Sequence, residues 1–391
     1  MFKIQTLNNI SADGLQRFPL DKYEVASEIT DPDAILLRSF KMHDMELSEN
    51  LKAIGRAGAG VNNIPVDKCT EKGIVVFNTP GANANAVKEL VITGLLMSSR
   101  KISDGINWAK TLIGDGDEVP KLVEKGKSSF VGPEIQGKTL GIIGLGAIGL
   151  LVANAADALG MKVIGFDPYI SIDAAWAMSH RVKRAKGIDQ LLGESDYISL
   201  HMPLSDDTKD YIDKNKFGMM KDGVRILNFA RAGLVNEEGL MEALNTDKVA
   251  CYVTDFPNES MLKEEKIISI PHLGASTPES ETNCAVMAVD ELREFLENGN
   301  IKNSVNFPEA ELKKNGNGAY RLCIANKNIP KMVGQITTVL ANEDINIADM
   351  LNRHYENIAY NIIDVDDEVT EAQLDKIKSI EGVVRVRLIK Q

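Results

Sequence analysis

The sequence contains little cysteine, fewer basic than acidic residues, and only one charge-free stretch of membrane length. Its four cysteines, Cys69, Cys251, Cys284 and Cys323, are too widely scattered for a CxxC metal site or a disulfide framework. We therefore expect no metal centre, and we expect the protein to work in a reducing compartment, the cytoplasm.

The deficit of basic residues limits the kinds of partner. Lysine and arginine total 44 against 56 aspartate and glutamate residues, a net charge of −12. This charge argues against non-specific binding to nucleic acid or to an anionic membrane surface. The first residues, MFKIQTLNNI, lack the apolar core of a secretion signal. The charge-free stretch Thr139–Ala156 contains four glycines, which favours a buried strand entering a helix over a membrane span.

The composition that is present suits folded domains. Apolar residues make up 44% of the 391 residues, and at about 150 residues per domain this length suggests two to three domains. Short apolar strands alternate with helical patterns, which predicts an α/β fold of two doubly wound parallel sheets. The strands are expected at residues 2–7, 34–37, 51–55, 74–78, 139–143, 162–166, 197–201, 224–228, 249–255 and 267–270, and the helices at 85–100, 149–159, 238–245 and 279–296.

A third pattern fills the C-terminal part of the chain. The run KKNGNG at residues 313–318 is polar, contains glycine and lacks periodicity, so it is typical of a linker. Beyond it, the expected order is a strand, a helix, two strands, a helix and a last strand. This βαββαβ order is the ferredoxin-like arrangement. The unit contains no cluster of catalytic residue types, so regulation or assembly is its expected role.

The strongest local motif is the glycine turn GLGAIG, residues 144–149, which follows an apolar strand and opens a helix. In a dinucleotide site, Gly144 permits the tight turn, Gly146 lets the backbone approach a pyrophosphate, and Gly149 lets the helix pack against the strand. Asp167 ends the next strand, where a carboxylate accepts the ribose hydroxyls and repels a 2′-phosphate. The motif predicts NAD binding in preference to NADP; the alternative is a glycine turn without a ligand.

A second glycine-rich turn, Gly55-Arg-Ala-Gly58-Ala-Gly60, lies upstream. Its spacing differs from the dinucleotide motif, and no suitable acid follows it. Consecutive backbone amides in such a turn can bind a small anion, for example a carboxylate. A purely structural turn is the alternative interpretation.

Candidate catalytic residues follow two of the predicted strands in the second part of the chain. Arg231, in the run NFARAG, follows a strand at the edge where open α/β sheets bind ligands, and its guanidinium suits the carboxylate of a 2-oxo or 2-hydroxy acid. His272, in the run PHLGAS, also follows a strand and suits proton transfer to a ketone or from an alcohol. Glu259, in the run FPNE, would orient the imidazole and raise its pKa. A solvated arginine and a structural histidine are the alternatives.

The motifs GLGAIG, NFARAG, FPNE and PHLGAS, in that order and with Asp167 after the first, resemble the D-2-hydroxyacid dehydrogenases. The resemblance covers residues 1 to about 308, and the C-terminal unit resembles an ACT domain. It implies a substrate-binding domain at residues 1–90 and 284–308, an NAD-binding domain at 91–283, a linker at 309–318 and an ACT-like regulatory domain at 319–391. It also places the active site in the cleft between the first two domains.

The resemblance further implies NAD-linked oxidation of a phosphorylated hydroxy acid, 3-phosphoglycerate, to 3-phosphohydroxypyruvate, the first step of serine biosynthesis. The implied catalytic residues are Arg231, Glu259 and His272. The implied coenzyme contacts are Gly144, Gly146, Ala147, Ile148, Gly149, Asp167, His201, Pro203, Thr208, Ala230, Asp255 and Gly274. The implied substrate contacts are Arg38, Ser39, Gly58, Ala59, Gly60, Val61 and Asn83, with Arg38 as the cation for the phosphate.

Two runs depart from the family pattern. The run Val253-Thr254-Asp255-Phe256 stands where the family has DxF, so either Thr254 or Asp255 is expected to meet the nicotinamide amide. In ACT-regulated relatives a loop with histidine, asparagine and Pro-Gly holds a serine effector. Here the candidate effector contacts are Asn326, Asn328 and Asn346.

Two other functions fit the same motifs. One is oxidation or reduction of an unphosphorylated acid, as in glycerate, hydroxypyruvate or lactate-type members of the family. The other is a non-enzymatic, NAD(H)-sensing binding protein with the same fold. Because family members are dimers or tetramers, a homodimer or homotetramer is expected, and the arm at residues 115–135 could reach a neighbouring copy.

Overall fold

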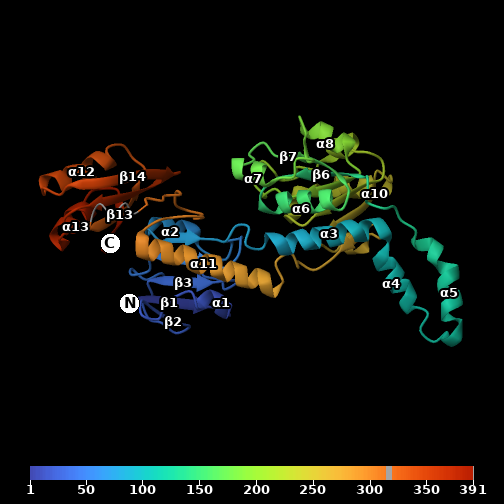
Figure 1. Ribbon diagram of the computed structural model, residues 1–391, viewed down its shortest axis with the longest axis horizontal. Helices are drawn as coiled ribbons and strands as arrows, with labels where there is room; N and C mark the ends of the chain where they lie inside the picture. The colour runs from blue at the N-terminus through green and yellow to red at the C-terminus, as the bar shows by residue number, and fades with distance from the viewer. Residues whose placement is uncertain (314–318, 391) are drawn as a thin grey trace. The chain divides into compact units, whose positions relative to one another are not determined.

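The computed structural model describes residues 1–313 and 319–390, so part of the linker expected at 309–318 lies outside the described residues. The chain forms two compact units (Figure 1). The terminal unit comprises Met1–Asn83 and the chain from Pro278 onward, and the central unit comprises Ala84–Thr277. The divisions coincide with the starts of two long helices, α3 (Ala84–Arg100) and α11 (Pro278–Asn298).

A five-stranded parallel sheet forms the first layer of the terminal unit, in the order β2-β1-β3-β4-β5. Its elements are β1 (Phe2–Leu7), α1 (Ala12–Leu15), β2 (Tyr23–Ala26), β3 (Ala34–Leu37), β4 (Ala53–Arg56), α2 (Val66–Glu71) and β5 (Val75–Phe77). The strands β3, β4 and β5 are almost entirely buried, because α11 covers one face of the sheet and α2 the other. Alternate residues such as Leu36 and Leu37 therefore enter different cores.

The C-terminal residues 319–390 belong to the terminal unit and have the expected ferredoxin-like order of elements. They form an antiparallel sheet, the C-terminal sheet, in the order β14-β15-β13-β16. Their elements are β13 (Tyr320–Lys327), α12 (Met332–Asn342), β14 (Ile347–Tyr355), β15 (Ile358–Val365), α13 (Glu371–Lys378) and β16 (Val383–Lys390). One face packs against α12 and α13. The other face shares a core with α11, so this sheet is a layer of the terminal unit.

Side chains of the C-terminal sheet cap the C-terminal end of α11. Arg321 Nη1 donates to the carbonyl of Asn298 at 2.8 Å, and the Tyr360 hydroxyl donates to that of Gly299 at 2.8 Å. These carbonyls have no partner within the helix, and positive charge there also suits the helix dipole. Gly299 ends the helix with φ +72°, a conformation that favours glycine. The sheet therefore fixes this helix end.

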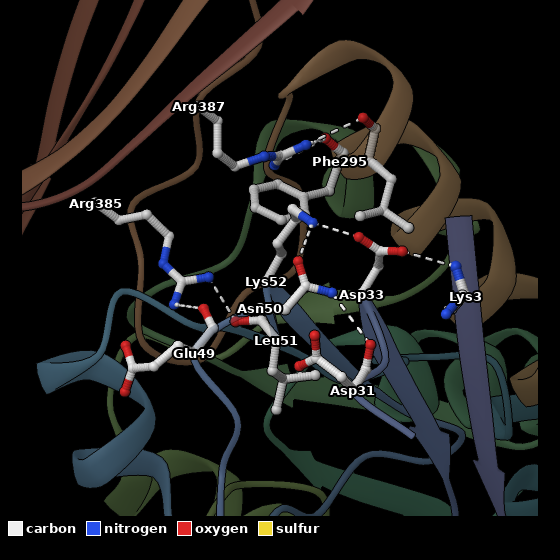
Figure 2. Close-up of polar contacts among 11 residues, drawn as sticks. Lys3, Asp31, Asp33, Glu49, Asn50, Leu51, Lys52, Phe295, Arg385 and Arg387 are labelled. Carbon is white, nitrogen blue, oxygen red and sulfur yellow. Dashed lines mark hydrogen bonds and ion pairs between the residues drawn. The ribbon is translucent and has the colours of Figure 1, made fainter. Parts of the chain in front are cut away.

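Two further arginines of β16 hold the sheet on the first layer (Figure 2). Arg387 donates to the carbonyls of Phe295 and Leu296, and its guanidinium lies 4.3 Å from the centroid of the Phe295 ring. Arg385 donates to the carbonyl of Leu51 at 2.5 Å and to that of Glu49 at 3.2 Å, just before β4. The two guanidinium groups thus join the C-terminal sheet to backbone oxygens of α11 and of the segment before β4.

The central unit is built on a seven-stranded parallel sheet in the order β12-β11-β10-β9-β6-β7-β8. Its strands are β6 (Thr139–Ile143), β7 (Lys162–Phe166), β8 (Lys183–Arg184), β9 (Tyr197–Leu200), β10 (Val224–Asn228), β11 (Val249–Thr254) and β12 (Ile267–Ser269). The helices are α6 (Ala147–Ala158), α7 (Ile172–Ala177), α8 (Ile188–Glu194), α9 (Lys214–Met219) and α10 (Glu237–Asn245). The strand order reverses between β6 and β9, which makes their carboxyl ends the expected ligand position.

An arm extends from α3 and contains α4 (Ile102–Lys110), η1 (Gly116–Glu118), α5 (Val119–Gly126) and η2 (Lys127–Phe130). The sequence analysis expected a polar connection or a peripheral arm at residues 115–135 and no helices in it. A small aromatic contact organises it, because the Trp108 and Phe130 rings lie 5.3 Å apart between centroids. Within the described ranges, no helix combines the length and apolarity needed to cross a membrane.

Glu291 is an acidic residue buried on α11, with 7% of its surface exposed. Its Oε1 accepts a hydrogen bond from Asn303 Nδ2 at 2.7 Å, and its Oε2 is buried without a partner in the described part of the chain. Burial raises the pKa of this carboxyl from 4.5 to about 8. The folded chain therefore keeps a proton that the unfolded chain releases, and the free energy of unfolding falls as pH rises from 4.5 through 8.

Glu291→Gln should remove this pH-dependent loss, because an amide stays neutral. We expect the variant to exceed the wild type by about 2–4 kcal/mol in the free energy of unfolding above pH 8, and by little near pH 5. Urea denaturation across this pH range measures the difference. The control, Glu279→Gln, changes an exposed acid of the same helix. A difference that does not vary with pH would refute the assignment.

Candidate active site

The glycine turn between β6 and α6 forms the candidate coenzyme site. Gly144 has φ +92°, and a Cβ there would lie 2.7 Å from the carbonyl oxygen of His201. A Cβ on Gly149 would lie 2.0 Å from the Gly144 oxygen. Gly146 faces open space, with no atom within 4 Å of a Cβ position. Ala147 and Ile148 begin α6 directly after it, so unused helix amides border a space that suits a pyrophosphate.

Asp167 follows β7 and lies next to the glycine turn. Its Oδ2 accepts a hydrogen bond from Leu145 N at 2.7 Å, and its Oδ1 accepts one from Tyr169 N at 2.8 Å. Each carboxylate oxygen has a second lone pair, so this anchored side chain can still accept the ribose hydroxyls. The carboxylate is held in the position that the sequence predicted for it.

The loop after β9 contains three of the expected coenzyme contacts. His201 forms a hydrogen bond of 2.8 Å between Nε2 and the Ser199 hydroxyl. Burial lowers the pKa of His201 to about 4, so its imidazole is neutral near pH 7. Thr208 Oγ1 donates to the Pro203 carbonyl and accepts from Ser205 N, both at 2.7 Å. These bonds fix the loop beside the strand reversal.

Asp255 follows β11 and is 2% exposed. Neither of its carboxylate oxygens has a well-aligned hydrogen-bond partner in the described part of the chain. Burial raises the pKa of Asp255, and the charges of His272 and Arg231 oppose that shift. Both candidate catalytic residues therefore act on the same carboxylate. Gly274 also lies there, since a Cβ on it would be 3.6 Å from Asp255 Oδ2.

Arg231 and His272 are exposed but held by their surroundings. The buried Asn228 donates to the carbonyl of Arg231 at 2.9 Å, and its Oδ1 accepts from Ala230 N at 3.2 Å. Arg231 Nη1 donates to the Ala230 carbonyl at 2.6 Å. The His272 ring lies 4.6 Å from that of Phe256, between centroids. The sequence analysis did not single out Asn228, although its position at the end of β10 was a signal.

The two candidates for the nicotinamide amide differ in their hydrogen bonds. Thr254 Oγ1 already accepts a hydrogen bond from Phe256 N at 3.1 Å, and this residue is 1% exposed. Asp255 has two buried oxygens without such a bond. A buried acceptor without a partner is costly unless a ligand supplies the donor. Asp255, together with the open side of Gly146, fits a nicotinamide coenzyme.

Glu259 lies elsewhere than the sequence analysis expected. Its side chain is 85% exposed, and its carboxylate bonds Lys263 Nζ at 2.7 Å, one helical turn away. The structure does not bring it to the imidazole of His272. The intervening η4 (Met261–Lys263) is held by Asn258, whose Oδ1 accepts from Met261 N at 3.0 Å. The pairing of Glu259 with His272 stays a prediction.

The candidate substrate cation, Arg38, lies in the terminal unit, directly after β3. Asn8 Oδ1 accepts hydrogen bonds from the backbone amides of Arg38, Ser39 and Phe40, at 3.3, 3.1 and 2.8 Å. The Arg38 guanidinium forms an ion pair of 2.6 Å with Glu281, in the first turn of α11. The sequence analysis found neither Asn8 nor Glu281, because only the fold brings them to Arg38.

The second glycine turn lies in the same unit. Gly58 has φ +144°, and the guanidinium of Arg56 occupies the place of its missing side chain. Arg56 Nε also donates to the Arg38 carbonyl at 3.1 Å, which adds a second cation beside the turn. The carbonyls of Gly58 and Ala59 accept from Thr79 N and Asn78 Nδ2. Of the remaining expected contacts, Gly60 and Val61 complete the turn, and Asn83 precedes α3, all three partly exposed.

The three candidate effector residues do not come together within one chain. Asn326 is buried and accepts from Asn361 Nδ2 at 2.7 Å. Asn328 donates to the Glu356 carbonyl at the same end of the sheet. Asn346 donates to Asp366 at the opposite end, as the pairing of Ile347 with Val365 requires. A serine site formed by these residues within one chain is therefore inconsistent with the strand register.

Comparisons with known proteins agree on one family. Residues 92–277 match the family model described as "D-isomer specific 2-hydroxyacid dehydrogenase, NAD binding domain". The D-3-phosphoglycerate dehydrogenase of Methanocaldococcus jannaschii is 34% identical over 85% of this chain and 62% of its own length. The human D-3-phosphoglycerate dehydrogenase is 36% identical over 69% of this chain and 51% of its own length. The chain thus spans between about half and three-fifths of these curated relatives.

Solved structures show the same architecture. The NAD⁺-bound 3-phosphoglycerate dehydrogenase of Entamoeba histolytica matches with a TM-score of 0.59 and 28% identity, over 78% of this chain and 98% of that one. A glyoxylate reductase from Paecilomyes thermophila matches with a TM-score of 0.63 and 27% identity over the same shares.

Proposed function

We propose that this chain is a D-isomer specific 2-hydroxyacid dehydrogenase that uses NAD and oxidises 3-phospho-D-glycerate to 3-phosphohydroxypyruvate; the match of residues 92–277 to the NAD-binding domain of that family supports this assignment. The curated relatives quoted above are named for this substrate, and the chain offers a cation for each anionic end of it. With this activity the protein catalyses the first step of serine biosynthesis. NAD, when bound, supplies the acceptor for the hydride from C2.

The observation that supports this proposal most is the shared environment of Arg231 and His272 at the buried carboxylate of Asp255. Arg231 binds the substrate carboxylate, because its planar guanidinium can form two parallel hydrogen bonds with it. His272 accepts the proton of the C2 hydroxyl, since an imidazole can act as a general base. Asp255 accepts the amide protons of the nicotinamide.

His272, the proposed proton acceptor, needs a nearby carboxylate that stabilises the protonated imidazole. Glu259 is the family candidate, and it must leave Lys263 to reach the imidazole. Asp255 already acts electrostatically on His272 from a buried position. In the terminal unit, Arg38 binds the substrate phosphate, and the Gly58–Val61 turn offers backbone amides to the same ligand.

NADH formation with 3-phosphoglycerate and with D-glycerate tests the substrate. We expect kcat/KM to be roughly ten- to a hundredfold higher for 3-phosphoglycerate, because charged hydrogen bonds to the phosphate contribute about 1.5–3 kcal/mol. Arg38→Gln should reduce this ratio while leaving turnover of D-glycerate unchanged. A preference for D-glycerate would instead favour the hydroxypyruvate type. Tight NADH binding without turnover of any hydroxy acid would favour a binding protein.

The proposal extends to assembly and compartment. We propose a homodimer or homotetramer, because the arm exposes large apolar side chains that a partner copy would cover: Ile102, Ile106, Ile113, Val123 and Val131. Light scattering of the full chain measures this state. The cytoplasm suits the four cysteines, which are buried and form no disulfide in the described part of the chain.

A further inference from the structure

The side chain proposed to bind the substrate phosphate already has an anionic partner. Arg38 Nη1 lies 2.6 Å from Glu281 Oε1. Arg38 follows β3, and Glu281 lies in the first turn of α11, 243 positions later in the chain, which the layered fold of the terminal unit brings together. A phosphate that uses the same guanidinium nitrogens must replace this carboxylate.

The pair is open to exchange. The Arg38 and Glu281 side chains are 37% and 47% exposed, so water and solutes reach both. Exposed ion pairs contribute at most modestly to stability, because solvent screens the charges and both side chains lose freedom. A phosphate dianion carries more charge than a carboxylate and offers three acceptor oxygens to the fork of a guanidinium. The substrate can therefore displace the carboxylate.

The backbone around Arg38 need not move during this exchange. Asn8 holds the amide of Arg38, and the carbonyl of Arg38 accepts from Asn63 Nδ2 at 3.2 Å and from Arg56 Nε at 3.1 Å. The guanidinium is thus carried by a fixed loop. Only the ends of two flexible side chains change partner.

Glu281 also keeps a favourable position after displacement. It lies in the first turn of the 21-residue helix α11, where a negative charge suits the helix dipole. The opposite end of α11 is capped by Arg321, Arg387 and Tyr360, so the helix itself is anchored. Displacement of the carboxylate is therefore confined to this side chain.

We propose that Glu281 competes with the substrate phosphate for Arg38, occupying the guanidinium in the substrate-free protein and yielding it to a phosphate. This inference rests on the proposed function for the identity of the substrate. An unphosphorylated acid brings a hydroxyl to this position, which is too weak an acceptor to separate the pair. Glu281 thus raises KM for the phosphorylated substrate and leaves KM for an unphosphorylated acid unchanged.

Glu281→Gln tests the proposal, with Glu279→Gln as its matched control. Both acids lie exposed in the first turn of α11, so either change removes one charge from the same helix end, but Glu279 has no ion pair among the described residues. We expect Glu281→Gln to lower KM for 3-phosphoglycerate by about three- to fivefold, the range of an exposed ion pair. The kcat and the KM for D-glycerate should change by less than about twofold, and Glu279→Gln should leave all three constants unchanged.

A double-mutant cycle completes the test. In an Arg38→Gln background the effect of Glu281→Gln should disappear, because the contested guanidinium is absent. An unchanged or higher KM in Glu281→Gln overturns the proposal. An equal fall in Glu279→Gln, or a fall that persists in the Arg38→Gln background, overturns it as well, because either result would indicate a general charge effect.

Binding of inorganic phosphate separates this proposal from the proposed function. If the wild type makes no NADH from 3-phosphoglycerate, the substrate assignment fails. Calorimetric titration with inorganic phosphate still measures whether Glu281 competes with a phosphate for Arg38. A Kd that is lower in Glu281→Gln than in the wild type and in Glu279→Gln supports Glu281 as the competitor. Equal Kd values in all three proteins overturn it.

Discussion

His272→Ala is expected to lower kcat for 3-phosphoglycerate by about a hundredfold to ten-thousandfold while changing KM little. The reason is the position of the imidazole beside the buried Asp255, where it acts on the proton of the reacting hydroxyl and not on the anionic groups that bind the substrate. Steady-state rates of NADH formation measure the loss. NADH fluorescence should show unchanged coenzyme binding, because the glycine turn is untouched.

Arg231→Ala is the companion variant for this prediction. Its guanidinium is assigned to the substrate carboxylate, so both kcat and the affinity for the substrate should fall. A His272→Ala protein with normal kcat would remove the histidine from the reaction. An Arg231→Ala protein with normal KM would remove the arginine from substrate binding.

Asp364→Asn should cost the terminal unit about 3–5 kcal/mol of free energy of unfolding. Arg321 and Asp364 are 0% and 1% exposed, and they form two parallel bonds, Nε to Oδ1 at 2.6 Å and Nη2 to Oδ2 at 2.8 Å. An amide leaves the buried guanidinium without its counter-charge. The Asn298 carbonyl compensates for only part of this loss. The midpoint of urea denaturation measures the effect.

Two further variants test whether the loss of stability comes from the unpaired buried charge or from any change of charge in this region. Asp367→Asn, in the exposed loop that follows β15, should leave the midpoint unchanged. The double replacement Arg321→Met with Asp364→Leu should recover most of the lost stability, because no buried charge is then left alone. A loss below about 1 kcal/mol in Asp364→Asn would show that the pair is not needed.

The parts of the fold that the sequence predicted best are its buried parallel strands. The bounds of β1, β3, β6, β7 and β10 agree with the expected residues. All but β1 are mostly buried, and a strand covered on both faces is a nearly continuous apolar run. The edge strands β2 and β8 were missed, since they pair on one side only and contain charged residues, as in Tyr23–Ala26 and Lys183–Arg184. The fold class, the family resemblance and the NAD coenzyme are confirmed.

The candidate site was predictable where one short segment contains the chemistry. The glycine turn and Asp167 lie in adjacent strand ends, and their spacing predicts their proximity. Contacts between distant segments had no such signal. The pair of Arg38 with Glu281, and the hold of Asn8 on the Arg38 loop, depend on how helix α11 and strand β1 pack in the terminal unit. The hydrogen-bond partners of Thr254 and Asp255, on which the predicted nicotinamide contact depends, likewise had no signal in the sequence.

The shared core of α11 and the C-terminal sheet has a consequence for how such a protein can evolve. Cys323, Tyr360 and Ile362 of that sheet share a core with Phe295 of the helix. Arg387 donates to the carbonyl of Leu296 in the helix, and Arg385 donates to that of Leu51 before β4. A gene rearrangement that removed the sheet, or replaced it with another of the same topology, would expose apolar side chains and unpaired backbone carbonyls to solvent. Either change would therefore also require new residues on α11 and in the segment before β4.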